Sequence, residues 1–332
     1  MSSVFTTAPP IFSELEVEKI SLSLFNLSGK AHDLYSDRDQ NFLILSNSNQ
    51  KYVLKISNLA EPREILDLQN EAVLFIHTHD PALGVPLQMG RIKEIEKDGQ
   101  KYFVRLVEYL DGIFLKDRKM YSQDFEKLGK FLGRLSQSLA GFSHPAADRE
   151  FDWDIRSVSL IRSRLSDLKD ENMRKTVNHF LNEFEQHVSL VDLRMAVIHN
   201  DGNDHNVLIN EKGETTGIID FGDMIFSYQV AEVAVCMAYV GLEKDDPFLS
   251  MAQVLKGYHS VFPLNDAEIR SAIFLSCIRL CISVTMSAWR VKLFPENKYL
   301  SISQKPAWDL LRKLENEDLK ELSNRLMDFI EC

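Results

Sequence analysis

The chain has 332 residues, of which 45% are hydrophobic and 26% charged. This composition excludes a collagen-like, coiled-coil or disordered chain, and the length predicts two packing units with a substantial core. Thirty-eight Lys and Arg against 49 Asp and Glu give a net charge of −11, which argues against a general nucleic-acid binder and favours a cationic or zwitterionic ligand.

The cysteines and the apolar segments indicate the compartment. The four cysteines show neither CxxC spacing nor a matching histidine cluster, so we expect no zinc site, no disulfide framework and a reducing environment. The first residues lack a basic patch followed by an apolar run, the pattern of an export signal. The longest apolar stretch, Ala272–Trp289, is interrupted by Arg279 and by hydroxyl side chains, which favours a buried helix over a membrane span. We expect a cytoplasmic protein that binds neither nucleic acid nor a membrane.

The first third of the chain has the pattern of a sheet with one helix. Asn41–Ser46 and Lys51–Ser57 flank a short polar turn and predict a hairpin. The spacing of apolar residues over 62–79 predicts an amphipathic helix. Gly90–Ile95 and Lys101–Glu108, joined by a turn with an Asp-Gly pair, predict two more strands.

The remaining two thirds have mainly helical periodicity. Helices are predicted over Phe125–Leu139 and Ile155–Val188, with short strands at Ala196–His199, Asn206–Asn210 and Thr216–Asp220. The fold class is therefore α+β in two lobes. We predict an N-terminal lobe over residues 1–107, a hinge over 108–112 and a helical C-terminal lobe over 113–332.

One polar segment carries the chemistry. His199-x-Asp201 is followed by Asn206 at the fifth position after Asp201, and Asp220-Phe-Gly comes after a short hairpin. Phosphoryl transfer needs a carboxylate that accepts the hydroxyl proton, and an Asn and a second carboxylate that hold Mg²⁺. Asp201, Asn206 and Asp220 match these three roles. The alternative is that Asp and Asn here only form turns.

This chemistry predicts that the lobe over residues 1–107 binds the nucleotide and that the lobe over 113–332 carries the catalytic loop and the acceptor site. A strand lysine should grip the nucleotide phosphates and a helix glutamate should orient it; Lys55 and Glu71 lie at suitable places, although both residue types are common on solvated surfaces. The segment that would cover the phosphates has a single glycine, so we assign that role to Ser36, Arg38 and nearby amides. Arg38 can equally be a surface residue.

The acceptor would bind close to Asp201. An ammonium group needs carboxylates, which Asp204, Asp223 and Glu232 can supply, and an amino-acid carboxylate needs an arginine. Arg279 and Arg290 lie eleven residues apart within Ala272–Arg290 and can face one side of a helix. Their alternatives are a buried ion pair or a snorkelling surface arginine. Tyr239 and Trp289 are candidates for cation–π contact with the acceptor, or plain core.

These motifs resemble a known family. Four segments carry the resemblance: Ser36–Phe42, Ile198–Val207, Ile219–Met224 and Ser303–Trp308. They are similar to the aminoglycoside phosphotransferase and choline kinase superfamily, and within it to hydroxylysine kinases and their bacterial relatives. The resemblance implies a protein-kinase-like fold, with the roles given above for Asp201, Asn206, Asp220, Lys55 and Glu71. It also implies that the backbone of Glu108–Leu110 contacts adenine or guanine.

The resemblance also shapes the functional expectation. Many members have Gly where this chain has Asn200, which we interpret as a subfamily trait. Relatives often carry a fused class III aminotransferase or lyase domain, so we expect that partner as a separate polypeptide. We expect a Mg²⁺-dependent kinase that transfers the γ-phosphate of ATP or GTP to the hydroxyl of an amine-bearing metabolite, hydroxylysine first. The alternatives are homoserine, choline, ethanolamine or an aminoglycoside as acceptor, or a silent nucleotide-binding module.

Overall fold

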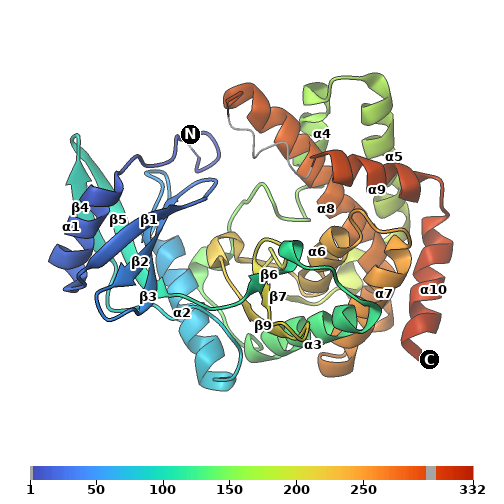
Figure 1. The fold of residues 1–332 in the computed structure, drawn as a ribbon. Helices are drawn as coiled ribbons and strands as arrows, with labels where there is room; N and C mark the ends of the chain where they lie inside the picture. The colour runs from blue at the N-terminus through green and yellow to red at the C-terminus, as the bar shows by residue number, and fades with distance from the viewer. Residues whose placement is uncertain (1–2, 297–303, 332) are drawn as a thin grey trace. The chain divides into compact units, whose positions relative to one another are not determined.

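The computed structural model describes residues 3–296 and 304–331. The chain divides into two compact units (Figure 1). The N-terminal unit comprises Met1–Leu74 and Val85–Asp111, and the C-terminal unit comprises Phe75–Gly84 and Gly112–Cys332. Phe75–Gly84 belongs with the second unit because Ile218 N donates to the Gly84 carbonyl, 3.0 Å away. The assignment of nucleotide binding to residues 1–107 and of a hinge to 108–112 stays a prediction.

A five-stranded antiparallel sheet forms the N-terminal unit. Its strand order is β1-β2-β3-β5-β4. The strands are β1 Gly29–Leu34, β2 Gln40–Ser46, β3 Lys51–Ile56, β4 Lys93–Lys97 and β5 Gln100–Glu108. Alternate residues of the central strands point into one core, including Phe42, Ile44, Leu54 and Leu106. The predicted hairpin and the two later strands are present.

This unit also contains structure that the sequence analysis did not predict. Helix α1, Glu14–Phe25, begins at Ser13, whose hydroxyl accepts from Glu16 N while the Glu16 carboxylate accepts from Ser13 N. The helix lies along β1, where Glu18 accepts from the backbone N–H of Ala31. The expectation of one helix therefore omitted α1. The expected helix over 62–79 is α2, Arg63–His79.

Helices make up most of the C-terminal unit (Figure 1). They are α3 Ser122–Ser138, α4 Val158–Ser163, α5 Glu171–His187, α6 Ala231–Val240, α7 Pro247–Val261, α8 Asp266–Leu293, α9 Gln304–Glu315 and α10 Leu319–Glu331. The single helix predicted over Ile155–Val188 is wrong, because a 3₁₀ turn separates α4 from α5 and the Asp170 carboxylate starts α5 by accepting from Met173 N.

Helix α8 is the central helix of this unit. It contacts α5, α6, α9 and α10, and all its residues from Ser271 to Ser287 are buried. Among the described residues it is the one helix long and apolar enough to cross a membrane, but 89% of its most apolar window is buried inside the protein. The prediction that Ala272–Trp289 forms a buried helix is confirmed.

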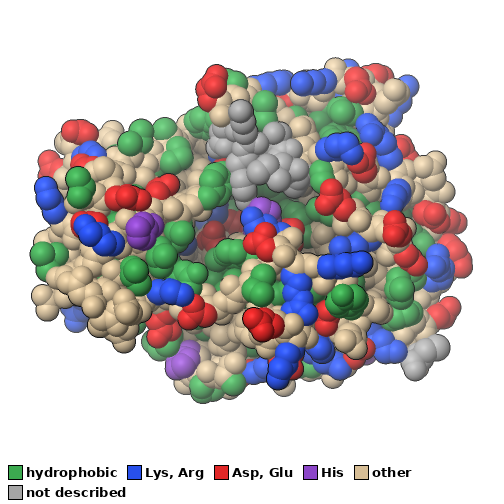
Figure 2. All heavy atoms as spheres, in the orientation of Figure 1, with side chains coloured by type: hydrophobic (Ala, Val, Ile, Leu, Met, Phe, Trp, Pro, Cys, Tyr) green, Lys and Arg blue, Asp and Glu red, His purple; other side chains and the backbone are tan. Residues whose placement is uncertain are grey.

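Two small antiparallel sheets hold the loops that carry the polar motif. One pairs β7, Met195–Ile198, with β10, Ile225–Tyr228. The other has the order β6-β8-β9, formed by Ile113–Phe114, Val207–Ile209 and Thr215–Ile218. The loop from β7 to β8 contains residues 199–206, and the turn after β9 contains Asp220. On the face that Figure 2 shows, basic and acidic side chains are interspersed over the C-terminal unit.

Candidate active site

The carboxylate of Asp201 is held by three side chains. Oδ1 accepts from Asn203 Nδ2 at 2.8 Å and from Arg279 Nη2 at 2.8 Å. Oδ2 accepts from Asn206 Nδ2 at 2.6 Å. The side chain remains 17% exposed. Asp201 therefore has a fixed orientation while part of its side chain still reaches solvent.

The loop around Asp201 rests on a fully buried histidine. His199 Nε2 lies 3.1 Å from the Ile219 carbonyl, and His199 Nδ1 accepts from Asp201 N at 3.2 Å. These two contacts require a neutral ring with its proton on Nε2. Burial lowers the pKa of His199 to about 4, which keeps the ring neutral. In this geometry His199 braces the loop, as the sequence analysis expects.

A buried carboxylate also binds the backbone of this loop. Glu232 on α6 is 0% exposed, and its Oε2 accepts from His199 N at 2.6 Å. It accepts from the backbone N–H of Asn200 as well, and burial raises its pKa to about 7. We offered Glu232 as a carboxylate for the acceptor's ammonium group. The structure corrects this, because the side chain is enclosed and bound to the loop backbone.

Asn200 occupies a backbone conformation that explains its residue type. Its φ is 66°, in the left-handed region, which glycine adopts freely and which asparagine tolerates better than most residues. Its Nδ2 lies within hydrogen-bonding distance of the carbonyls of Trp153 and Asp223, at 3.4 and 3.3 Å. Asn200 thus fits a backbone position that glycine would also suit, and it adds contacts that glycine lacks.

The hairpin β8–β9 brings Asp220 next to this loop. Val207 pairs with Ile218, and Ile219 N donates to the Asn206 carbonyl at 2.9 Å. Asp220 follows in the left-handed region with φ 63°, and its Oδ1 accepts from Gly222 N at 3.3 Å. Burial, together with the charges of Asp223 and Asp220, raises the pKa of Asp201 to about 7, while Arg279 acts in the opposite direction. The structure therefore brings the three residues of the predicted motif together.

The donor set suits a hard divalent cation. Because the amide nitrogen of Asn206 donates to both the carboxylate and the carbonyl of Asp201, its amide oxygen is left as an acceptor. Asp220 adds a carboxylate. No cluster of three or more His, Cys, Asp or Glu suited to a metal is present within 3–296 and 304–331. A Mg²⁺ ion needs fewer protein ligands, since phosphate oxygens and water complete its shell.

Three other acceptor-site candidates, Asp204, Asp223 and Arg290, also lie in the C-terminal unit. Burial raises the pKa of Asp204, and its carbonyl accepts from Lys116 N at 3.0 Å. Asp223 is 7% exposed and lies in the 3₁₀ turn after Asp220. Arg290 is buried on α8, with its guanidinium 6.0 Å from the ring of Phe294.

Arg279 differs from its expected role. It is 1% exposed and paired with Asp201 instead of being open to an acceptor carboxylate. The alternative of a buried ion pair is the one the structure shows. The aromatic candidates already have cations of the chain as partners, because Tyr239 lies 5.6 Å from the Arg279 guanidinium and Trp289 lies 3.8 Å from that of Arg164.

The remaining predicted residues lie in the N-terminal unit. Lys55 is on β3 opposite Arg105 of β5, and Glu71 is an exposed residue of α2. Ser36 and Arg38 belong to the loop between β1 and β2, where Asn58 donates to the Arg38 carbonyl at 3.1 Å. Glu108 ends β5 and exchanges hydrogen bonds with the backbone of Leu87, and Leu110 follows it. Their roles stay predictions.

Some site residues had no individual signal in the sequence. Asn203 binds Asp201 from within the motif, but Asn is common in turns and so does not indicate a functional role by itself. Arg149 donates to the carbonyls of Gly222 and Met224 and so holds the turn that follows Asp220. Trp153 contributes its carbonyl to Arg279 and to Asn200. Arg149 and Trp153 are about 50 to 75 residues away from the loops they contact, so only tertiary structure reveals them.

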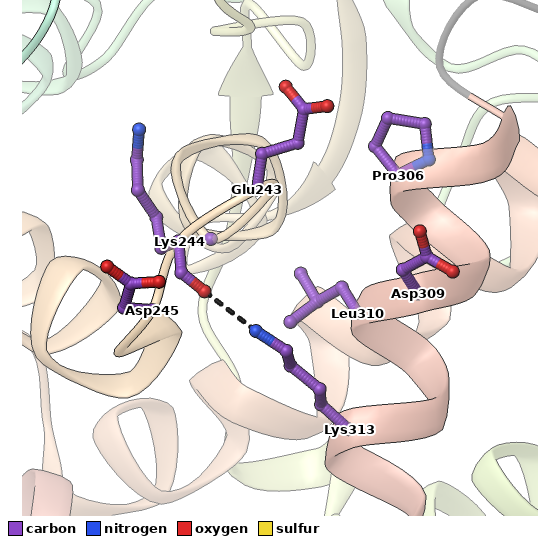
Figure 3. A pocket seen from close by; sticks show the side chains of 8 residues that line it. Glu243, Lys244, Asp245, Pro306, Asp309, Leu310 and Lys313 are labelled. Atoms are coloured by element: carbon purple, nitrogen blue, oxygen red, sulfur yellow. Dashed lines mark hydrogen bonds between the residues drawn. The ribbon is translucent and has the colours of Figure 1, made fainter.

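A separate hollow of about 340 Å³ lies between the α6–α7 connection and α9 (Figure 3). Lys313 Nζ crosses it to donate to the Lys244 carbonyl at 2.8 Å. Asp309, one of the acidic residues that line the hollow, is paired with Lys305 at 2.6 Å. None of the predicted site residues lines this hollow.

Comparison with known structures defines the fold first. Over 94% of its length the chain superposes on a microcompartment-associated aminopropanol kinase, covering 99% of it, with a TM-score of 0.76 and 15% identity. An amicoumacin kinase, solved with AMP-PNP, Ca²⁺ and amicoumacin, gives a TM-score of 0.69 at 16% identity, with 94% of this chain and 97% of that one covered. The predicted protein-kinase-like fold is confirmed.

Sequence comparison then defines the family. Residues 33–264 match the model of the phosphotransferase enzyme family, and the chain belongs to that family. Hydroxylysine kinase of Mus musculus is 30% identical over 93% of this chain and 90% of its own length. The Xenopus laevis hydroxylysine kinase is 31% identical, over 92% and 90%. The protein is thus a small-molecule kinase, as predicted.

Proposed function

We propose that this kinase transfers the γ-phosphate of ATP or GTP, with Mg²⁺, to the hydroxyl group of an amine-bearing metabolite, and that hydroxylysine is its acceptor. The observation that carries the proposal is the fixed carboxylate of Asp201, bound to Asn206 and adjacent to Asp220. The relatives named hydroxylysine kinase support the choice of acceptor. The cytoplasm as compartment and a separately encoded aminotransferase or lyase acting in the same pathway are part of the same proposal.

The proposal gives each of the predicted residues a role. Asp201 accepts the proton of the attacking hydroxyl group, for which a partly exposed side chain with a fixed carboxylate is suited. Asn206 and Asp220 would hold the divalent cation, which supplies neutralising charge to the phosphate oxygens. In the N-terminal unit, Lys55 with Glu71 would orient the phosphates, Ser36 and Arg38 would cover them, and the Glu108–Leu110 backbone would bind the base.

Acceptor selection would use the surroundings of the same loop. Asp204 and Asp223 are the carboxylates we assign to the ammonium group. Arg290 is the arginine we retain for a carboxylate, since Arg279 is engaged by Asp201. No contact with nucleic acid or membrane is part of the proposal.

A screen of acceptors tests the proposal. Purified protein with Mg²⁺ and either ATP or GTP is incubated with hydroxylysine, homoserine, choline, ethanolamine or an aminoglycoside, and nucleoside diphosphate release is followed. Lysine, which lacks only the hydroxyl group, is the matched control for hydroxylysine. We expect turnover with hydroxylysine and none with lysine. Turnover with another of these acceptors alone would move the assignment to it, and no turnover with any of them would overturn the proposal.

A further inference from the structure

The contact between Arg279 and Asp201 joins a buried cation to a partly exposed acid. Arg279 lies on the central helix α8 and is 1% exposed. Its Nη2 donates to Asp201 Oδ1 at 2.8 Å and its Nη1 donates to the Trp153 carbonyl at 3.0 Å. Its guanidinium also lies 4.6 Å from the Trp153 ring centroid. A planar group fixed at several points can hold a partner atom in one direction.

The positive charge of Arg279 is a second feature of this contact. Asp201 lies near two further carboxylates, Asp220 and Asp223, whose charges act on it. An arginine remains charged under all ordinary conditions, so Arg279 is a permanent cation beside these acids. Its buried position excludes much of the water that would otherwise screen the interaction. Loss of this cation would remove a buried positive charge that is paired with the carboxylate of Asp201.

The hydrogen bonds of Asp201 divide unequally between its two oxygens. Oδ1 receives Arg279 and Asn203, whereas Oδ2 receives Asn206 alone. A carboxylate oxygen has about two lone-pair sites, so the donors occupy Oδ1 and leave one site on Oδ2. Without Arg279 the carboxylate could rotate and lose this distinction.

We infer that Arg279 is a positioning residue for phosphoryl transfer, which binds Oδ1 of Asp201 and thereby keeps Oδ2 free to receive the proton of the acceptor hydroxyl group. The inference rests on the proposed function, in which Asp201 is the general base. It assigns Arg279 to the carboxylate of the enzyme instead of the carboxylate of the acceptor.

Kinetics of two variants test this role. Arg279→Met removes the charge and the hydrogen bonds. Arg279→Lys keeps the charge but lacks the planar guanidinium group with its several N–H donors. We expect kcat to fall about 100-fold in Arg279→Met, the order of loss that follows misplacement of a catalytic group, with KM for nucleotide and acceptor unchanged. Arg279→Lys should recover part of the loss. Arg270→Met is the matched control, because Arg270 lies on the same helix, is exposed and binds Asn324.

Two results would overturn the inference. One is an unchanged kcat in Arg279→Met. The other is a rise in acceptor KM with kcat retained, which would return Arg279 to acceptor binding. If Arg279→Met does not give a folded protein by thermal melting, Arg279→Lys decides by the same split between kcat and KM.

A double-mutant cycle separates this inference from the proposed function. If Arg279 acts through Asp201, adding Arg279→Met to Asp201→Asn should cost nothing beyond Asp201→Asn alone. Independent losses that multiply would contradict the positioning role. Full activity of Asp201→Asn would instead overturn the base assignment, whereas an inactive Asp201→Asn with a fully active Arg279→Met would overturn only the role of Arg279.

Discussion

At the scale of single residues, the proposed chemistry depends on the charge of Asp201. Asp201→Asn keeps the size of the side chain and can still accept from some of its donors. We expect kcat to fall by about 10²–10⁴-fold, the usual contribution of a general base. Nucleotide affinity should stay the same, because the substitution leaves the N-terminal unit unchanged. Steady-state kinetics and calorimetric titration with a non-hydrolysable nucleotide measure the two effects, and loss of nucleotide binding would contradict the role.

Asp220 permits a similarly conservative test of metal binding. Its φ of 63° is one that Asn adopts as readily as Asp, so Asp220→Asn should preserve the turn. A ligand that loses its charge binds a hard cation more weakly. We expect the Mg²⁺ concentration for half-maximal activity to rise by about tenfold or more.

Titration of activity with Mg²⁺ measures this change. Asp328→Asn, an exposed acid on α10, serves as the control with no expected effect. Removal of the metal by EDTA should abolish transfer by the parent protein. A lower kcat with unchanged Mg²⁺ dependence would mean that Asp220 acts in another way.

At the scale of elements, helices α3 and α7 pack against each other through a glycine of each helix. A Cβ on Gly129 of α3 would lie 2.0 Å from the Val254 carbonyl oxygen, and a Cβ on Gly257 of α7 would lie 2.0 Å from that of Glu126. Both backbones are therefore too close for any side chain. This close contact fixes two helices of the unit that carries the catalytic loop.

Gly129→Ala tests that contact. Helix propensity alone predicts stabilisation by about 1 kcal/mol, but overpacking against a backbone atom costs about 1–3 kcal/mol or more. We expect the clash to prevail and the urea midpoint to fall. Gln137→Ala, at an exposed site of the same helix, should change stability by no more than about 0.5 kcal/mol. A stabilised Gly129→Ala would show that the helices separate at little cost.

Local sequence patterns account for some elements and not for others. The hairpin β2–β3 and helix α2 were predictable because alternation and helical spacing are properties of neighbouring residues. Helix α1 escaped because only Val17 and Ser21 are buried, while its apolar residues Leu15 and Leu22 are 67% and 51% exposed. The apolar residues of α1 therefore do not lie on one face of the helix, and the helical periodicity of the sequence is weak there. Its capping signal, Ser13 with Glu16, was present in the sequence.

The same distinction holds for the candidate site. Asp201, Asn206 and Asp220 were predictable because one loop and one hairpin carry all three. The partner of Asp201 was not, since Arg279 is 78 residues away in the chain and reaches it only through the packing of α8. A buried polar side chain on an apolar helix indicates that a partner exists, but it does not identify that partner.

At the scale of the whole molecule, buried titratable groups couple folding to pH. Burial raises the pKa of Glu232 to about 7 from an ordinary 4.5, and that of Asp201 also to about 7. Between its unfolded and its folded pKa, each of these two carboxyl groups binds more protons in the folded chain than in the unfolded chain. Both groups therefore make the stability of the fold decrease as pH rises. His199 acts in the opposite direction, because its folded pKa of about 4 lies below the ordinary 6.5.

Glu232→Gln isolates one of these contributions. The variant keeps an oxygen that can accept from the backbone N–H groups of His199 and Asn200, but it cannot ionise. Compared with the variant, the parent should lose up to about 3 kcal/mol of unfolding free energy as pH rises from about 4.5 to about 7. Urea denaturation of both proteins across this range measures the difference. A difference that stays constant with pH would mean that Glu232 has the same protonation state in the folded and unfolded chain, and one that changes in the parent's favour would reverse the predicted direction of its pKa shift.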